Sequence, residues 1–243
     1  MIATANMKGR RPFTDAETAR LRAEGFPSSK SPWARRDLAL FILQDWSGYR
    51  ISELLSLTVG DVLAAGLPKG RPDLPVTPDQ IVERLAIPPR HMKRGEPRSP
   101  IKLHREAKEY LAAWLESMRQ AGVLAPATPV FYSRKHRRTR ADPRLPLAGL
   151  PEAPADASSK SDLRPITADQ ALRIYKAACR RCGVYGQTGT HSLRKRFGLR
   201  ALRNSGNNLR VAQRALGHRN VASTEAYLPV EQDELDRAVV GED

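Results

Sequence analysis

The chain has no long hydrophobic run and few cysteines. Its most apolar stretch, Leu38 to Leu43, covers six residues, whereas a helix that crosses a bilayer needs about 20. The N-terminus also lacks a basic segment followed by an apolar one, which a secretory leader would have. These absences exclude membrane-spanning, collagen-like and disulfide-scaffold proteins, so we expect no membrane partner and a cytoplasmic location.

Metal and cofactor signatures are missing as well. Cys179 and Cys182 have the C-x-x-C spacing, but no second cysteine pair or nearby histidine completes a zinc site. We therefore interpret them as small packed residues. The sequence also contains no Walker phosphate-binding motif and no clustered set of carboxylates. We expect neither a metal ion nor a cofactor.

Negative charge is scarce relative to positive charge. The 243 residues include 41 Lys and Arg against 26 Asp and Glu, a formal net charge of +15. With 40% hydrophobic and 28% charged residues the composition is that of a globular protein. A folded domain with this surplus favours a polyanionic partner, most often nucleic acid, over the alternative of a basic protein without one.

Hydrophobic periodicity predicts a mainly α fold with a small antiparallel β-sheet, an α+β class. Helices are predicted over residues 13–25, 34–47, 105–120, 167–182, 190–204, 208–216, 221–228 and 231–240. A hairpin is predicted within 81–103, and a third short strand over 130–132. We expect a basic leader over 1–12, one domain over 13–230 with a flexible insertion at about 141–165, and a tail helix over 231–243.

Local signals predict where several of these helices begin and end. Thr14 and Thr167 are each followed three residues later by Glu or Gln, the spacing of a capping box. Gly48 is predicted to end one helix and Ser52 to cap the next. This places Arg50 on a sharp corner between two helices.

Separate segments carry residues suited to phosphate chemistry. The segment from Trp46 to Leu57 contains Arg50 and Glu53, and Lys93 begins Lys-Arg-Gly-Glu-Pro-Arg. The C-terminal third adds His191 and Arg194 on one predicted helix, His218 directly after Leu-Gly, and Tyr227 nine residues later. Each element alone is common in proteins. In this order they resemble the tyrosine recombinase (phage integrase) family, and the resemblance runs from about Arg11 to Tyr227.

The resemblance implies a site-specific DNA recombinase that integrates, excises or inverts a segment. A tyrosine hydroxyl attacks a DNA phosphodiester, giving a 3′-phosphotyrosyl bond and a free 5′-hydroxyl, and a second 5′-hydroxyl reverses the step. The covalent intermediate conserves the bond energy, so neither ATP nor a metal is needed. The positions that the family uses for catalysis correspond to Arg50, Lys93, His191, Arg194, His218 and Tyr227.

The same resemblance implies a role for each residue. Tyr227 is the nucleophile and His191 the general base, while Lys93 protonates the leaving 5′-oxygen. Arg50 and Arg194 bind the non-bridging oxygens, because planar guanidinium groups fit a phosphate. His218 donates one more hydrogen bond to the phosphate. Glu53 either supports an arginine or is a solvated carboxylate.

Three other tyrosines compete with Tyr227 for the nucleophile's role. Tyr132, Tyr175 and Tyr185 do not follow a Leu-Gly-His at the family's spacing. Tyr132 and Tyr175 fit apolar packing instead. We therefore expect none of the three to attack DNA.

Other basic residues are predicted to contact DNA backbone phosphates and to supply salt-dependent affinity. They are Arg134, Lys135, Arg137, Arg138, Arg140, Lys195 and Arg196. A solvated loop without DNA contact is the alternative for 134–140. The tail helix carries a small apolar stripe of Leu235, Val239 and Val240. It either docks into a neighbouring copy, forming a dimer or tetramer on double-stranded DNA, or packs on its own domain.

The chain departs from the family before its first motif. Most members place a DNA-clamping domain there, but only 49 residues precede Arg50. We expect a catalytic domain without the clamp, similar to the small recombinases that invert fimbrial promoter segments, and a bacterial, nucleoid-associated location. Two alternatives stay open: a type IB topoisomerase, which shares the chemistry, and a DNA-binding regulator or accessory protein that retains the fold.

Overall fold

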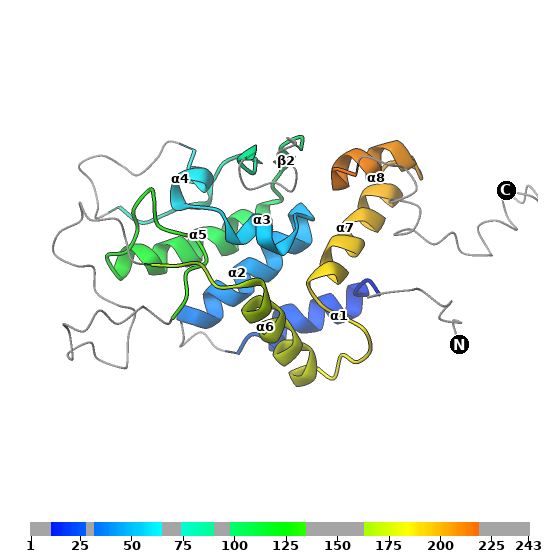
Figure 1. Ribbon diagram of the computed structural model, residues 1–243, viewed down its shortest axis with the longest axis horizontal. Coiled ribbons are helices and arrows are strands. Elements are labelled where there is room, and N and C mark those ends of the chain that lie inside the picture. Colours follow the sequence, from blue (N-terminus) through cyan, green and yellow to red (C-terminus); the bar gives the residue numbers. More distant parts are fainter. Residues whose placement is uncertain (1–10, 28–31, 65–73, 90–97, 135–162, 219–243) are drawn as a thin grey trace, which may run out of the picture.

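The computed structural model describes residues 11–27, 32–64, 74–89, 98–134 and 163–218 (Figure 1). The longer helices are α2 (Pro32–Ser47), α5 (Arg105–Gln120), α6 (Ala168–Arg181), α7 (Thr190–Asn204) and α8 (Leu209–Leu216). The shorter ones are α1 (Asp15–Arg20), the π-helical turn η1 (Leu21–Gly25), α3 (Ile51–Leu55), α4 (Val59–Val62) and the 3-10 turn η2 (Pro78–Gln80). The mainly helical α+β class is confirmed.

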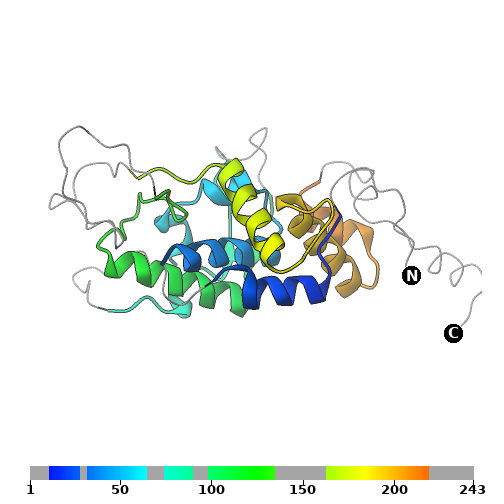
Figure 2. The same ribbon diagram turned by 90° about the horizontal axis from the view of Figure 1, so that it is seen from below.

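Helix α2 lies at the centre of the core because it carries the apolar run that the sequence analysis singled out. Residues 39–43 are all buried, and α2 packs along α5. The fully buried Trp114 of α5 donates its indole N–H to the carbonyl of Val130 at 2.7 Å. On the other side, the ring of Phe41 meets that of Tyr175 in α6 edge to face, with 5.4 Å between centroids. Figure 2 shows α6 crossing steeply over α2.

The antiparallel pairing predicted within 81–103 is confirmed, but the strands are short, and residues 90–97 between them lie outside the described residues. Strand β1 (Arg84–Leu85) pairs antiparallel with β2 (Ile101–Lys102), with Leu85 opposite Ile101. The predicted third strand over 130–132 is wrong. This segment makes only isolated bridges, with Pro129 opposite Thr58 and Pro165 opposite Tyr132. The segment changes partner along its length: Val130 bonds Leu57, whereas Phe131 bonds Ile166, so neither bridge extends into a ladder.

Helices α7 and α8 form the opposite end of the molecule from the loops that follow α5, as both ribbon views show. They approach each other closely at Gly198. A Cβ atom there would lie 2.9 Å from Cδ1 of Leu216. The small residue therefore lets the C-terminal end of α8 rest directly on α7.

Most of the predicted helix ends are confirmed. Thr14 and Thr167 accept the N–H groups of Glu17 and Gln170 as capping boxes require. Gly48 ends α2 with φ +60, and a side chain there would collide with the ring of Phe197. The assignment of Ser52 as N-cap is wrong, because α3 begins at Ile51 with Arg50 at the N-cap. The Glu53 carboxylate bonds the Arg50 N–H, so this carboxylate rather than a serine hydroxyl satisfies the helix start.

Several expectations lie outside the described residues. These are nearly all of the 1–12 leader, most of the 141–165 insertion, and the helices at 221–228 and 231–240. In the portions of the chain that the structure covers, none of the helices has the length and hydrophobicity needed to span a membrane.

A buried carboxylate ties α2 to α7. Asp45 is completely buried near the end of α2. Its oxygens bind Arg22 of η1 at 2.6 Å and Arg196 of α7 at 2.6 and 2.8 Å. Arg200, one turn further along α7, donates to the Asp45 backbone carbonyl. One carboxylate thus fixes α7 against the first half of the chain, although its α7 partners lie more than 150 residues away in sequence.

Replacing Asp45 by Asn tests this contact. The variant keeps the shape but leaves the surrounding guanidinium groups without their counter-charge, so we expect the free energy of unfolding to fall by about 3 kcal/mol. Urea denaturation followed by circular dichroism measures the change. The control is Asp169→Asn, an exposed position in the first turn of α6, with an expected change within about 0.5 kcal/mol. Equal losses in the two variants would contradict the role of Asp45.

Candidate active site

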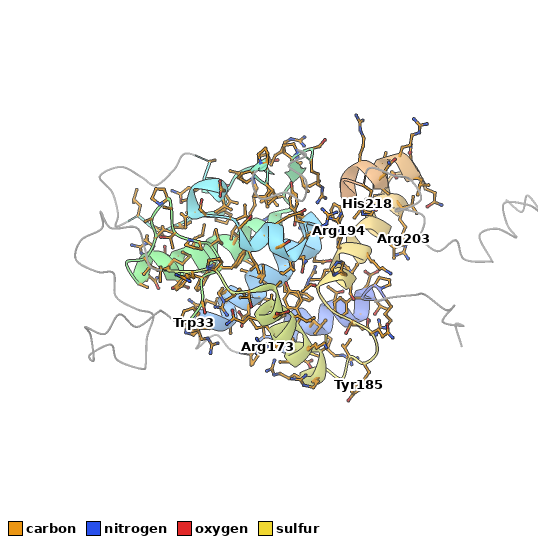
Figure 3. The ribbon with its side chains drawn as sticks, in the orientation of Figure 1. Trp33, Arg173, Tyr185, Arg194, Arg203 and His218 are labelled. Carbon is orange, nitrogen blue, oxygen red and sulfur yellow. The ribbon has the colours of Figure 1, made fainter. Side chains whose placement is uncertain are left out.

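Three segments that are far apart in sequence meet in the gap between α3 and the α7–α8 pair. Arg50 comes from the start of α3, Arg194 from α7, and His218 from the residue pair after α8. Figure 3 shows Arg194 and His218 next to each other at this place. The charges of Arg50 and Arg194 both act on the His218 imidazole. The structure therefore brings together three of the six residues predicted to be catalytic.

Arg50 is held by the glutamate that follows it one helical turn later. The Glu53 carboxylate accepts the Arg50 backbone N–H at 2.8 Å and its Nη1 at 2.7 Å. Glu53 is 4% exposed, whereas 38% of the Arg50 side chain is exposed. Of the two interpretations of Glu53, the contact with an arginine is the one that the structure contains. The buried Glu53 thus holds the Arg50 guanidinium by one side, while part of the Arg50 side chain faces solvent.

Arg194 is 2% exposed, and it joins two helix ends. Its Nη1 donates to the Gly48 carbonyl at 2.7 Å and its Nη2 to the Leu216 carbonyl at 2.5 Å. Carbonyl groups at the C-terminal end of a helix carry partial negative charge and need donors. The guanidinium supplies donors to the ends of α2 and α8 at once, and so fixes where these two helices end relative to α7.

His218 is placed by the left-handed turn that ends α8. Gly217 has φ +64, and the His218 N–H bonds the Gln213 carbonyl at 3.1 Å, as in a helix C-cap. Gln213 Nε2 in turn donates to the His218 carbonyl at 3.1 Å. Burial, and then the charges of three arginines, lower the pKa of His218 from 6.5 to about 4. At neutral pH the imidazole is therefore uncharged, with one N–H to donate.

The third of these arginines is Arg98, which the sequence analysis missed. Its Nη2 donates to the Ser47 carbonyl at 3.1 Å and also to the Ala215 carbonyl. Burial and the neighbouring Arg194 lower the pKa of Arg98 to about 9. Nothing in its local sequence marks it, because its partners come from segments about 50 and 120 residues away.

The other predicted residues are placed differently. His191 lies exposed in the first turn of α7, although Arg194 three residues later is buried. Lys93 and Tyr227 lie outside the described residues, as do Lys135, Arg137, Arg138, Arg140, Leu235, Val239 and Val240. Arg134 is exposed and lies 5.3 Å from the Trp33 ring, which Figure 3 shows well away from His218.

Lys195 and Arg196 face the protein interior. Lys195 is 6% exposed, and burial lowers the pKa of its ammonium group. Arg196 bonds Asp45, and its Nη2 lies 2.7 Å from Asp15. These contacts favour a structural role over the predicted phosphate contacts.

Two of the three alternative tyrosines and both cysteines are buried in the core, whereas Tyr185 is exposed. Tyr132 and Tyr175 are buried, and burial raises the pKa of Tyr132 to about 12 and that of Tyr175 further above its usual value. Tyr185 is 76% exposed. Cys179 and Cys182 are free and buried. Among the residues that the structure describes, no three His, Cys, Asp or Glu side chains are grouped to hold a metal.

Solved structures share this fold. The XerH site-specific recombinase, in a post-cleavage complex with a palindromic difH substrate, superposes with a TM-score of 0.63 at 16% identity, over 98% of this chain and 55% of that one. XerA recombinase gives a TM-score of 0.61 at 16% identity, over 96% and 65% of the two chains. At such identities the likeness concerns the fold alone.

Sequence comparison adds a curated relative and a family. Tyrosine recombinase XerC of Rhodospirillum centenum (strain ATCC 51521 / SW) is 26% identical over 226 residues, which are 93% of this chain and 52% of the relative. The chain thus spans about half the length of that relative. The model of the Phage integrase family matches residues 25–234, a range that includes all six predicted catalytic positions. The chain therefore belongs to the phage integrase family.

Proposed function

We propose that this chain carries the catalytic domain of a site-specific DNA recombinase, which cuts and rejoins double-stranded DNA through a 3′-phosphotyrosyl intermediate. The observation that carries the proposal is the meeting of Arg50, Arg194 and His218 at one place. Family membership over residues 25–234 supports it. The XerH structures, which are complexes of that recombinase with its difH substrate before and after cleavage, support it as well.

The charges at the site suit a phosphodiester. Arg50, Arg98 and Arg194 surround His218, and Glu53, which is paired with Arg50, is the acidic group whose charge reaches Arg98. A site with surplus positive charge stabilises the extra negative charge that a phosphate gains in the transition state. Arg50 and Arg194 bind the non-bridging oxygens in this proposal. The neutral His218 donates a hydrogen bond without adding a charge that would titrate near pH 7.

The chemical step exchanges one phosphoester for another. The Tyr227 oxygen attacks the phosphorus, the bond from phosphorus to the 5′-oxygen breaks, and the 3′-phosphate stays on the tyrosine. His191 accepts the phenolic proton, and Lys93 gives a proton to the departing 5′-oxygen. His191 is exposed in the first turn of α7, three residues before Arg194. Attack by a new 5′-hydroxyl runs the same steps in reverse.

Assembly and domain organisation follow the same proposal. Because recombination joins strands from several sites, two or four copies act together on DNA, with Leu235, Val239 and Val240 of one tail docked on the next copy. The domain spans 13–230 and acts in the bacterial cytoplasm, on nucleoid DNA. The basic run of 134–140 contacts backbone phosphates, whereas Lys195 and Arg196 hold α7 in place.

A covalent trapping experiment tests the reaction. Candidate sites are inverted repeats that flank the gene or a nearby promoter, and each is placed in a duplex with a nick beside the expected cleavage point. The nick lets the short product diffuse away, so the protein–DNA adduct accumulates. We expect wild-type protein to form the adduct and Tyr227→Phe to form less than about 1% of it, because the attacking oxygen is lost.

The matched control is Tyr185→Phe, which removes an exposed hydroxyl from another tyrosine and is expected to react like wild type. Specific binding without any adduct would contradict the proposal and favour a DNA-binding regulator. Relaxation of supercoiled plasmids without site preference would contradict site-specific recombination and favour a type IB topoisomerase.

Salt dependence tests the contribution of the basic run. With a formal charge of +15, we expect affinity for a short duplex to fall more than about 100-fold between 50 and 200 mM salt. The triple variant Lys135→Gln, Arg137→Gln, Arg138→Gln loses up to three phosphate contacts. Its plot of log affinity against log salt should be shallower by about 2. Fluorescence anisotropy measures both slopes.

The control for this experiment is the double variant Arg173→Gln, Lys176→Gln, at two exposed positions of α6. Figure 3 shows Arg173 well away from His218. We expect it to leave the slope unchanged. A triple variant whose slope equals that of wild type would show that 134–140 is a solvated loop.

A further inference from the structure

Arg98 stands where the hairpin returns to the helices. It is the first described residue after the segment that contains Lys93, and β2 begins three residues later. Its side chain reaches across the candidate site. None of the six residues that the family resemblance assigns to catalysis corresponds to it.

Arg98 and Arg194 bond neighbouring carbonyls on the same two helix ends. Arg194 donates to Gly48 and Leu216, and Arg98 donates to Ser47 and Ala215, each residue being one position earlier in the chain. Two guanidinium groups from different elements thus join the end of α2 to the end of α8. Because His218 comes directly after Gly217 at the end of α8, its position depends on these hydrogen bonds.

The Arg98 side chain lies against an aromatic ring and packs closely on Gly217. The guanidinium carbon lies 4.3 Å from the centroid of the Tyr49 ring, and the Tyr49 hydroxyl donates to the Leu85 carbonyl in β1 at 2.8 Å. At Gly217, a Cβ atom would lie 2.8 Å from Cδ of Arg98. The side chain therefore has a single place between the hairpin and the end of α8.

A contribution to folding stability does not by itself explain why a buried guanidinium occupies the position of Arg98. Nε and Nη1 of Arg98 are buried and have no hydrogen-bond partner among the described residues. The positive charges of Arg194 and Arg50 act against that of Arg98, and the Glu53 carboxylate offsets them only in part. An arrangement of three like charges around His218 is unfavourable without an anion and becomes favourable when an anion binds.

We infer that Arg98 is a positioning residue of the recombinase site, which fixes His218 relative to Arg50 and Arg194 so that its imidazole can donate to the phosphate. Among the described residues, the charges that act on His218 are those of Arg194 from α7, Arg50 from the start of α3, and Arg98 before β2. Removing one of these charges lets the imidazole take up a proton at higher pH. The inference rests on the proposed function, but its electrostatic half can be measured without DNA.

The experiment compares Arg98→Lys, which keeps the charge, with Arg98→Met and Arg98→Gln, which remove it. Nuclear magnetic resonance of labelled imidazoles gives the pKa of His218, with the signal assigned by its loss in His218→Gln. We expect the pKa to rise by about half a unit in the two neutral variants and to stay near the wild-type value in Arg98→Lys. If Arg98 contributed only packing, the pKa of His218 would not differ between the charged variant and the two neutral variants.

Cleavage of the nicked duplex supplies the second readout. All three variants should form the adduct at least about 10-fold more slowly, because Met and Gln remove the cation and an ammonium lacks the planar face that lies over the Tyr49 ring. In the neutral variants the acidic limb of the pH profile should also move to higher pH. The control is Arg84→Met, an exposed arginine of β1, which should change neither quantity.

Two results would overturn the inference: a His218 pKa that is unchanged in both neutral variants, or wild-type cleavage rates in all three Arg98 variants. The neutral pair keeps the test decisive if one of them fails to fold, as judged by circular dichroism. An absent adduct with the wild-type protein has a different meaning. It overturns the proposed function and leaves the titration of His218 to decide the electrostatic part.

Discussion

The guanidinium of Arg194 donates to the carbonyls of Gly48 and Leu216, and the placement of the other groups at the site depends on these two bonds. Gly48 leads into the corner that carries Arg50, and Leu216 leads into the turn that carries His218. A buried arginine in the middle of α7 therefore fixes two catalytic candidates from opposite ends of the chain. In the proposed reaction, Arg194 contributes this geometry as well as its charge.

The second constraint is electrostatic. Around His218 the arginines are balanced only in part by Glu53, whereas at the far side of α7 Asp45 binds Arg22 and Arg196 directly. The same helix thus has a neutralised side that holds it in place and a cationic side that is suited to an anion. Burial makes both sides sensitive to a single charge, because the interior screens charges less than water does.

Most features of the fold and site that depend on residues close together in sequence were predicted correctly, and contacts between distant residues were not. Helix positions, the caps at Thr14 and Thr167 and the hairpin follow from local patterns, and they are confirmed. The third strand was wrong because residues 130–132 divide their bonds between two different segments, and Arg98 was missed because its partners are distant in sequence. Motif order located Arg50, Arg194 and His218, but it could not show that Arg196 bonds Asp45.

The most direct test of the account is a structure of Tyr227→Phe bound to a duplex that carries its cleavage site. The account predicts that the non-bridging oxygens of one phosphate lie within hydrogen-bond distance, about 3 Å, of the Arg50 and Arg194 guanidinium groups. It also predicts that His218 donates to the same phosphate. A complex in which the DNA passes over another face, with no phosphate between α3 and α8, would contradict the account.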